Sequence, residues 1–260
     1  MQIAPPSPSL ADEHPVLFIL LGASNLARAC SGLMNGLTRC LSPRPVEYLH
    51  AMGPGRAYIT EGGLLNAVYP PILNCGILDA ARKKDKDKTT VALVTDIGND
   101  IMYGVPAEEI VAGLQTLFSE LEEIGADTFI TAIPVDLEKD VGESYFRILR
   151  RIFFPKSRVE YHEAASTVQT VNRFIKESAS KKIVALEGME KFCGRDKIHY
   201  SLLASHRAWS YVAGEMLNRL NATAPINIGP IDMVSSLTAN MSRILCTDML
   251  GIVKKSDATF

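Results

Sequence analysis

Several features that would mark a specialised class of protein are absent from the sequence. No apolar run reaches the length of about 18 residues that a membrane-spanning helix requires. The first apolar run, residues 16–21, follows Asp12 and Glu13 and has no lysine or arginine before it, which is the reverse of a signal peptide's charge pattern. We therefore expect neither a membrane span nor a secretory leader.

Positive charge and paired cysteines are also lacking. The formal net charge is -2, so the chain has no basic surplus for neutralising nucleic-acid phosphates. It has five cysteines, and none of them stands in a Cys-x-x-Cys pair. An odd number without paired spacing favours neither a disulfide framework nor a zinc ribbon. We expect a reduced, cytoplasmic protein that does not bind nucleic acid.

What the chain does have is apolar sequence with a regular pattern. Of its 260 residues, 47% are hydrophobic, enough to bury the core of a large domain. Residues 1–15 are rich in proline, which predicts an irregular arm. Residues 16–220 carry the regular pattern. Residues 221–260 contain a connector and an amphipathic helix over 231–253. We expect that helix either to pack on its own molecule or to form a homodimer contact.

Within residues 16–220, short apolar runs alternate with segments of helical periodicity. The expected strands are 16–21, 46–52, 89–95, 127–134 and 182–187. The expected helices are 25–37, one or two within 62–81, 106–124, 142–154, 163–179 and 201–220. This alternation is typical of an α/β fold in which helices cover both faces of a parallel sheet.

Ser24 lies where the first expected strand turns into a helix, in Gly22-Ala23-Ser24-Asn25. In open parallel sheets, ligands bind beyond the carboxyl ends of the strands, which is where this turn falls. A serine in such a turn is often only a helix N-cap. Whether Ser24 is more than a cap depends on the side chains that the rest of the chain brings to it.

A base for that serine is offered by the turn after the last expected strand. His199 follows Asp196 by three residues, a spacing that can place both side chains on one side of a tight turn. A carboxylate there can accept the Nδ1 proton and fix the imidazole tautomer. His206 is the competing base, seven residues further on, while the other histidines fit structural roles.

Glycine-bearing turns after other strands offer donors for an oxyanion. The candidates are the backbone N–H groups of Ser24 and of Gly55 or Gly53, together with the side-chain amide of Asn99. Because the carboxyl ends of parallel strands share one edge of the sheet, we expect these groups to converge. Asn99 taken alone fits a turn-forming role equally well.

Taken together, four short blocks resemble those of the SGNH or GDSL hydrolases, in the order of that family. They are Ser24 in Gly-Ala-Ser-Asn-Leu, the Gly53-Pro-Gly55 turn, Gly98-Asn99-Asp100, and Asp196 to His199. Over roughly residues 16–219, the resemblance implies a flavodoxin-like three-layer α/β/α sandwich with a five-stranded parallel sheet.

The resemblance also implies a function and the residues that carry it. It implies hydrolysis of a small-molecule ester, with Ser24 as nucleophile, His199 as base, Asp196 as its orienter, and Gly55 and Asn99 in the oxyanion hole. It implies no metal or organic cofactor. In the first block, Ala23 stands where the family has an aspartate, and Gly53 remains an alternative to Gly55.

Other functions fit the sequence less well. An α/β-hydrolase elbow needs a second glycine after the serine, where this chain has Leu26. Neither a phosphate-binding nor a dinucleotide-binding glycine motif follows the first strand. Two alternatives stay open: a non-catalytic binding domain on the same fold, and an enzyme that transfers the acyl group to an alcohol instead of water.

Overall fold

The centre of the molecule is a five-stranded sheet. The structure is a computed structural model that describes residues 14–64, 67–84, 86–222, 224–250 and 258–260. The strands are β1 (Val16–Leu21), β2 (Val46–Ala51), β3 (Thr89–Val94), β4 (Asp127–Thr131) and β5 (Ile183–Leu186). Their order is β2-β1-β3-β4-β5, and every neighbouring pair is parallel. This is the flavodoxin-like order, and the predicted fold class is confirmed.

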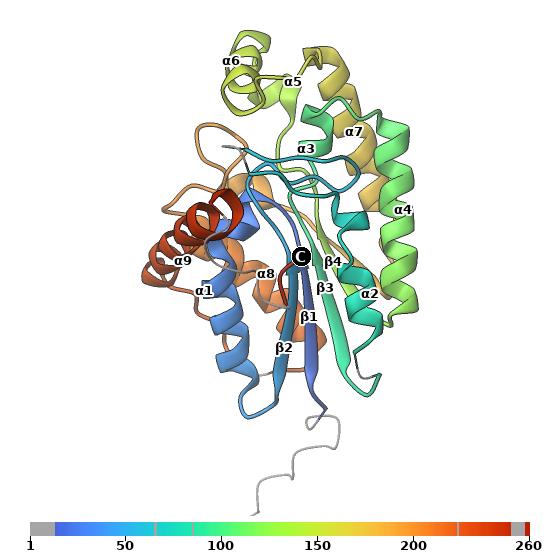
Figure 1. Ribbon diagram of the computed structural model, residues 1–260, viewed down its shortest axis with the longest axis vertical. Coiled ribbons are helices and arrows are strands. Elements are labelled where there is room, and N and C mark those ends of the chain that lie inside the picture. The colour runs from blue at the N-terminus through green and yellow to red at the C-terminus, as the bar shows by residue number, and fades with distance from the viewer. Residues whose placement is uncertain (1–13, 65–66, 85, 223, 251–257) are drawn as a thin grey trace, which may run out of the picture.

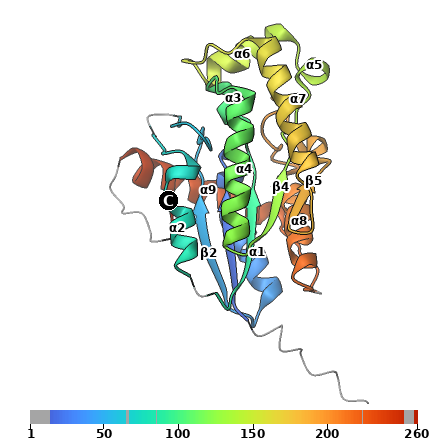
Figure 2. The ribbon, with the colours of Figure 1, turned by 90° about the vertical axis from the view of Figure 1, so that its right-hand side faces the viewer.

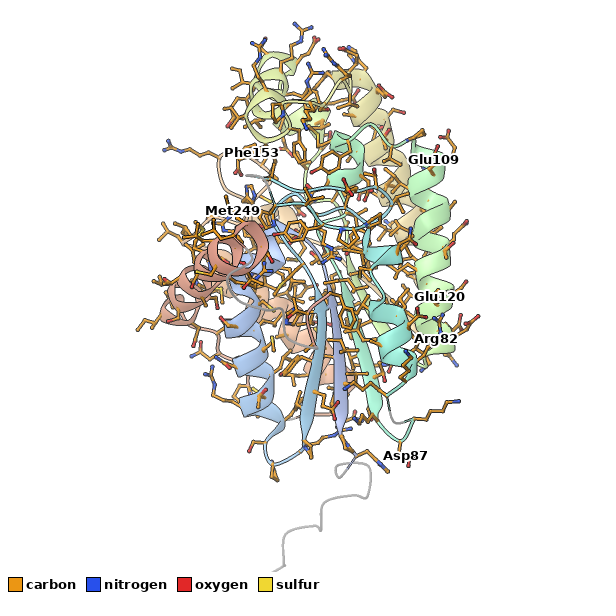
Figure 3. All side chains as sticks on the ribbon, in the orientation of Figure 1. Arg82, Asp87, Glu109, Glu120, Phe153 and Met249 are labelled. Carbon is orange, nitrogen blue, oxygen red and sulfur yellow. The ribbon has the colours of Figure 1, made fainter. Side chains whose placement is uncertain are left out.

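Helices cover both faces of the sheet (Figure 1). On one face lie α1 (Ser24–Leu41), α8 (Ser205–Arg219) and α9 (Pro230–Arg243), and on the other lie α2 (Ile77–Arg82), α4 (Ala107–Glu123) and α7 (Tyr161–Glu177). Figure 2 shows the second group in front of the strands. At the lower end of this group, Arg82 of α2 and Glu120 of α4 form an ion pair, and both are labelled in Figure 3.

The position of β1 in the sheet explains why its sequence is an uninterrupted apolar run. Alternate side chains of a strand point to opposite faces. Leu17, Ile19 and Leu21 accordingly join the core beneath α4 and α7, while Val16, Phe18 and Leu20 join the core beneath α1 and α8. Because helices cover both faces, all six residues are buried.

The carboxyl ends of the strands lie toward the upper end of the molecule in Figure 1. Three short or medium helices gather there, α3 (Asn99–Met102), α5 (Leu137–Asp140) and α6 (Glu143–Phe153). The turn after β1, the turn after β3 and the long connection after β5 therefore reach the same edge. This convergence depends only on the strands being parallel and in this order.

Two predicted helices differ from the structure. Among the described residues within 62–81, the helical ones come after the two prolines, in the 3-10 turn η2 (Ile72–Asn74) and in α2. Before the prolines, Gly62 pairs with Tyr69 in an isolated antiparallel bridge. Gly63, with φ +150, lies against Ala67, where a Cβ would meet its carbonyl oxygen. The prediction of a helix before Pro70 was therefore wrong. The helix expected from residue 201 begins instead at Ser205, after a turn.

The C-terminal region contacts the molecule in two places. Helix α9 packs on α1, where the Gly32 N–H donates to Ser236 Oγ at 2.6 Å. At the very end of the described chain, the N–H of His50 on the edge strand β2 donates to the Ala258 carbonyl at 2.9 Å, and the Phe260 N–H donates to the His50 carbonyl at 3.1 Å. The sequence had predicted the helix, but not this edge pairing.

The predicted amphipathic segment 231–253 is only partly described. Helix α9 is followed by a π-helical turn, η4 (Ile244–Met249), and the end of the segment lies outside the described residues, as does nearly all of the arm 1–15. In the described chain, no helix is both long and apolar enough to cross a membrane. All five cysteines are free thiols.

Candidate active site

A chain of hydrogen bonds joins Ser24, His199 and Asp196. Ser24 is the first residue of α1, and its Oγ lies 3.0 Å from Nε2 of His199. The other ring nitrogen, Nδ1, lies 2.8 Å from Oδ2 of Asp196. With the ring proton on Nδ1, the imidazole donates to the carboxylate and leaves Nε2 free to accept the serine proton.

The turn that carries His199 holds Asp196 as a carboxylate. Asp196 Oδ1 accepts the backbone N–H groups of Ile198 at 3.1 Å and His199 at 3.0 Å. Burial opposes ionisation of Asp196, but the hydrogen bonds from the His199 ring and from these backbone groups outweigh it and lower its pKa to about 2. Asp196 is therefore negatively charged at neutral pH and fixes the ring's orientation.

The N-terminus of α1 is capped by a side chain from a different strand. Ala23 occupies the N-cap position and has no capping side chain. Oδ2 of Asp96, the second residue after β3, accepts the N–H groups of Ala23 at 2.9 Å and Leu26 at 3.1 Å. The interpretation of Ser24 as an N-cap is therefore wrong, because Asp96 takes that role and the Ser24 hydroxyl faces His199.

Asn25 ties the serine turn to the histidine turn. Its Nδ2 donates to Asp96 Oδ1 at 2.9 Å and to the Ile198 carbonyl at 3.1 Å, while its Oδ1 accepts the Tyr200 N–H at 2.9 Å. These contacts hold the chain on either side of His199. Asn25 therefore sets the distance between the two turns without contacting the imidazole itself.

Sequence reasoning did not assign roles to Asp96 or Asn25. Asp96 adopts φ +60, a left-handed conformation that aspartate tolerates better than most residues. A polar residue just after a buried strand was the available signal. Its partners lie about 70 positions earlier in the chain, so the spacing of residues could not identify them.

The predicted oxyanion donors differ in whether they line the cavity that contains Ser24. Asn99 begins α3 and lines the same cavity as Ser24, and its Nδ2 donates to the Arg56 carbonyl at 2.7 Å. Gly55 takes φ +72, and its carbonyl accepts the Tyr103 hydroxyl at 2.7 Å. Gly53 packs against the Tyr69 ring. Among the described residues lining the cavity, neither glycine is present.

The loop after Gly55 is held by a buried carboxylate. Asp100 of α3 is fully buried and accepts the N–H groups of Tyr58 at 2.8 Å, Ile59 at 2.9 Å and Thr60 at 3.3 Å. Burial raises the pKa of Asp100, against these hydrogen bonds, which lower it. The Gly-Asn-Asp block thus joins the glycine turn through both Asn99 and Asp100.

The remaining histidines lie in other surroundings. His206, the competing base, sits on α8 with its Nδ1 buried and without a partner among the described residues. Burial lowers the pKa of His50 on β2 to about 4, and His162 is exposed on α7. The structure thus places His199, and not His206, against Ser24.

The site has a polar end and an apolar end. The ring of Phe153, labelled in Figure 3 near the end of α6, stands edge-on to the His199 ring with 5.7 Å between centroids. A cavity of about 100 Å³ extends from Ser24 beneath the upper helices. Across the described residues, no group of three or more histidine, cysteine or acidic side chains is gathered as metal ligands.

Comparison with known proteins gives only distant structural similarity. Neither a protein-family model nor a curated protein matches the sequence. The psychrotrophic esterase EstA from Pseudoalteromonas sp. is 12% identical, with 78% of this chain and 98% of that chain covered and a TM-score of 0.46. An aryl esterase of M. smegmatis is 9% identical, with 77% and 98% covered and a TM-score of 0.49.

Proposed function

We propose that this protein is a serine esterase of the SGNH or GDSL type, with Ser24, His199 and Asp196 as its catalytic residues. The observation that carries the proposal is the continuous set of hydrogen bonds from Ser24 Oγ through the His199 ring to Asp196. A hydroxyl nucleophile needs a base within hydrogen-bond reach and a group that orients the base. All three groups also lie at the carboxyl end of the sheet, where α/β proteins bind ligands.

In this proposal an ester is cleaved through an acyl-enzyme. Ser24 Oγ attacks the ester carbonyl as its proton passes to His199 Nε2, and the alcohol leaves with that proton when the tetrahedral intermediate collapses. His199 then takes a proton from water, whose oxygen attacks the acyl group on Ser24. The carboxylic acid leaves, and Ser24 regains its proton.

The oxyanion is stabilised by the donors around Ser24. N–H groups in the first turn of a helix have no intrahelical acceptor, so the Ser24 N–H at the start of α1 is a suitable donor. The Asn99 amide has two hydrogens, and the bond to the Arg56 carbonyl occupies one of them. The second is the proposed side-chain donor. The Gly55 N–H stays a prediction, because Gly55 is not among the described residues that line the cavity.

The test is hydrolysis of p-nitrophenyl acetate by the full chain and by Ser24→Ala. We expect Ser24→Ala to lose the enzyme-dependent rate while its thermal melt stays within a few degrees of the wild type, because the hydroxyl carries the chemistry and not the cap. Ser119→Ala, an exposed serine on α4, is the matched control and should retain full activity.

Equal activity in Ser24→Ala and wild type would overturn the proposal. A wild type that hydrolyses no ester at all would favour the non-catalytic binding domain on the same fold. Adding an alcohol and measuring the new ester formed separates acyl transfer from hydrolysis.

A further inference from the structure

The cavity beside Ser24 has walls that suit one kind of ligand. It runs from Ser24 and Asn99, past the ends of β3 and β4, to the inner sides of α6 and α7. Its depth is lined by aliphatic and aromatic side chains, among them Ile101, Ile133, Phe146, Leu149 and Val168. All five are buried, so the lining is part of the folded core and not a surface depression.

The polar groups in these walls already have partners. Asp96 accepts three hydrogen bonds from the α1 turn, and Thr131 Oγ1 bonds Thr95 Oγ1 at 2.7 Å. Lys197 lies toward the Asp140 carboxylate at 3.7 Å with its side chain partly exposed. A charged or hydroxylated ligand would lose its hydration there and gain little in return, whereas a hydrocarbon loses nothing.

We propose that this cavity binds the acyl chain of the substrate, and that the preferred chain is an unbranched aliphatic one of about four to six carbons. The proposal rests on the proposed function, since it assigns a substrate class to the Ser24 site. An enclosed apolar cavity of about 150 Å³ is known to hold a six-carbon benzene ring. By comparison, a volume of about 100 Å³ suits about four carbons beyond the carbonyl of a short acyl chain.

The acyl part of the ester, and not the alcohol, fits a cavity of this shape. The acyl group stays bonded to Ser24 while water attacks, so an apolar cavity that holds it keeps the intermediate in place. The alcohol has to leave before water can enter. It therefore departs on the side of the site that lies away from the buried walls.

Helix α6 determines the size of the cavity. Phe146 and Leu149 face inward, while Ile148 on the opposite side of the helix is 55% exposed. The helix is fixed to the catalytic turn by the Tyr145 hydroxyl, which donates to the Arg195 carbonyl at 3.3 Å, and by the Phe153 ring against His199. Leu149 is thus a specificity-determining position, and Ile148 is a neighbouring position that leaves the cavity unchanged.

The experiment measures kcat/KM of the full chain on p-nitrophenyl acetate, butyrate, hexanoate, octanoate and decanoate. We expect a rise of about tenfold from acetate to butyrate, because each buried methylene is worth up to about fourfold, and a decline beyond hexanoate. Leu149→Phe should move the optimum to shorter chains and Leu149→Ala to longer ones. Ile148→Phe is the matched control and should leave the profile unchanged.

A fluorophosphonate probe separates the two ways of failing. If Ser24 forms the phosphonyl adduct in the folded Leu149 variants but their chain-length profiles equal the wild type's, the acyl-cavity proposal is overturned and the esterase proposal stands. A response to Leu149 substitution only in a series of acetate esters with longer alcohols overturns it too. If the wild-type protein forms no Ser24 adduct and cleaves no ester, both proposals fail.

Discussion

At the scale of single residues, Asp96 supplies the carboxylate that position 23 lacks. The N-terminus of a helix carries unpaired N–H groups and a partial positive charge, so a carboxylate placed there stabilises it. Asp96 meets two of those N–H groups and also holds Asn25, which in turn contacts both sides of His199. The alanine at position 23 is therefore compatible with a well-held Ser24 turn.

Asp96→Ala should lower stability and activity together. Loss of the cap should reduce the free energy of unfolding by about 1–2 kcal/mol, and loss of the anchor for Asn25 should let the Ser24 and His199 turns separate and lower kcat by more than tenfold. Urea unfolding and ester hydrolysis measure the two effects. Asp79→Ala, at an exposed position on α2, serves as the control, and an Asp96→Ala variant that matches it in both measurements would contradict this role.

The lowered pKa of Asp196 leads to a prediction about how stability depends on pH. Its pKa of about 2 in the folded protein lies below the value of about 3.9 for an unperturbed aspartate, so folding favours the ionised form. The resulting stabilisation is present above about pH 4 and is lost as the pH falls through about 2. The difference in unfolding free energy between wild type and Asp196→Asn should shrink over that interval.

The same substitution should act on catalysis at neutral pH. Asparagine cannot accept the Nδ1 proton in the way a carboxylate does and favours the wrong ring tautomer, so kcat should fall on the order of 10⁴-fold. Urea melts from pH 2 to pH 7 and turnover at pH 7 measure the two effects. A stability difference that is constant with pH, or a kcat within tenfold of wild type, would contradict the assignment.

At the scale of elements, the strands were predicted well and one loop was not. The β1 strand was predicted with its observed bounds because burial on both faces leaves a continuous apolar run. Residues 62–71 also contain buried apolar side chains, Ala67 and Tyr69, so their composition resembles that of a helix. Glycines and prolines in the segment instead allow a folded loop, which covers the glycine turn.

The contact of α9 with α1 depends on a glycine. A Cβ at Gly32 would lie 2.7 Å from Met233 Cε, 2.8 Å from Ser236 Oγ and 3.1 Å from the Asp232 carbonyl oxygen. Gly32→Leu should therefore push α9 away and lower the free energy of unfolding by about 1–3 kcal/mol, while the Ser24 site at the start of α1 keeps its ester hydrolysis.

Chemical unfolding together with an ester assay measures this outcome. Asn35→Leu, at an exposed position on the same helix, is the control for adding a leucine side chain to α1. A Gly32→Leu protein as stable as Asn35→Leu would mean that α9 contributes nothing at this contact.

At the scale of the whole molecule, sheet topology explains which parts of the site could be predicted. Ser24 follows β1, Asn99 follows β3 and His199 follows β5, and parallel strands in the order β2-β1-β3-β4-β5 bring all three segments to one edge. Predicting that convergence required only the strand pattern. The cap that Asp96 provides, the contacts of Asn25 on either side of His199 and the cavity beneath α6 arise from contacts between distant segments. No local sequence pattern encodes such contacts.

The arrangement of the C-terminal region is also a feature of the whole molecule. We propose that residues 16–220 form the hydrolase unit and that the described part of residues 221–260 packs on it as an extension. Helix α9 covers α1, and Phe260 packs with the core near β2. On its outward side α9 leaves Ile231, Val234 and Met241 exposed, so a homodimer contact through this face stays a prediction.

The central claim is that His199 activates Ser24, and covalent labelling tests it most directly. Wild-type protein treated with a fluorophosphonate should gain one phosphonyl group, which peptide mass spectrometry should locate on Ser24. Ser24→Ala should gain none, His199→Ala should react at least a hundredfold more slowly, and His162→Ala, at an exposed histidine, should react like the wild type. An adduct on another residue, or labelling of Ser24 that is equally fast without His199, would contradict the account.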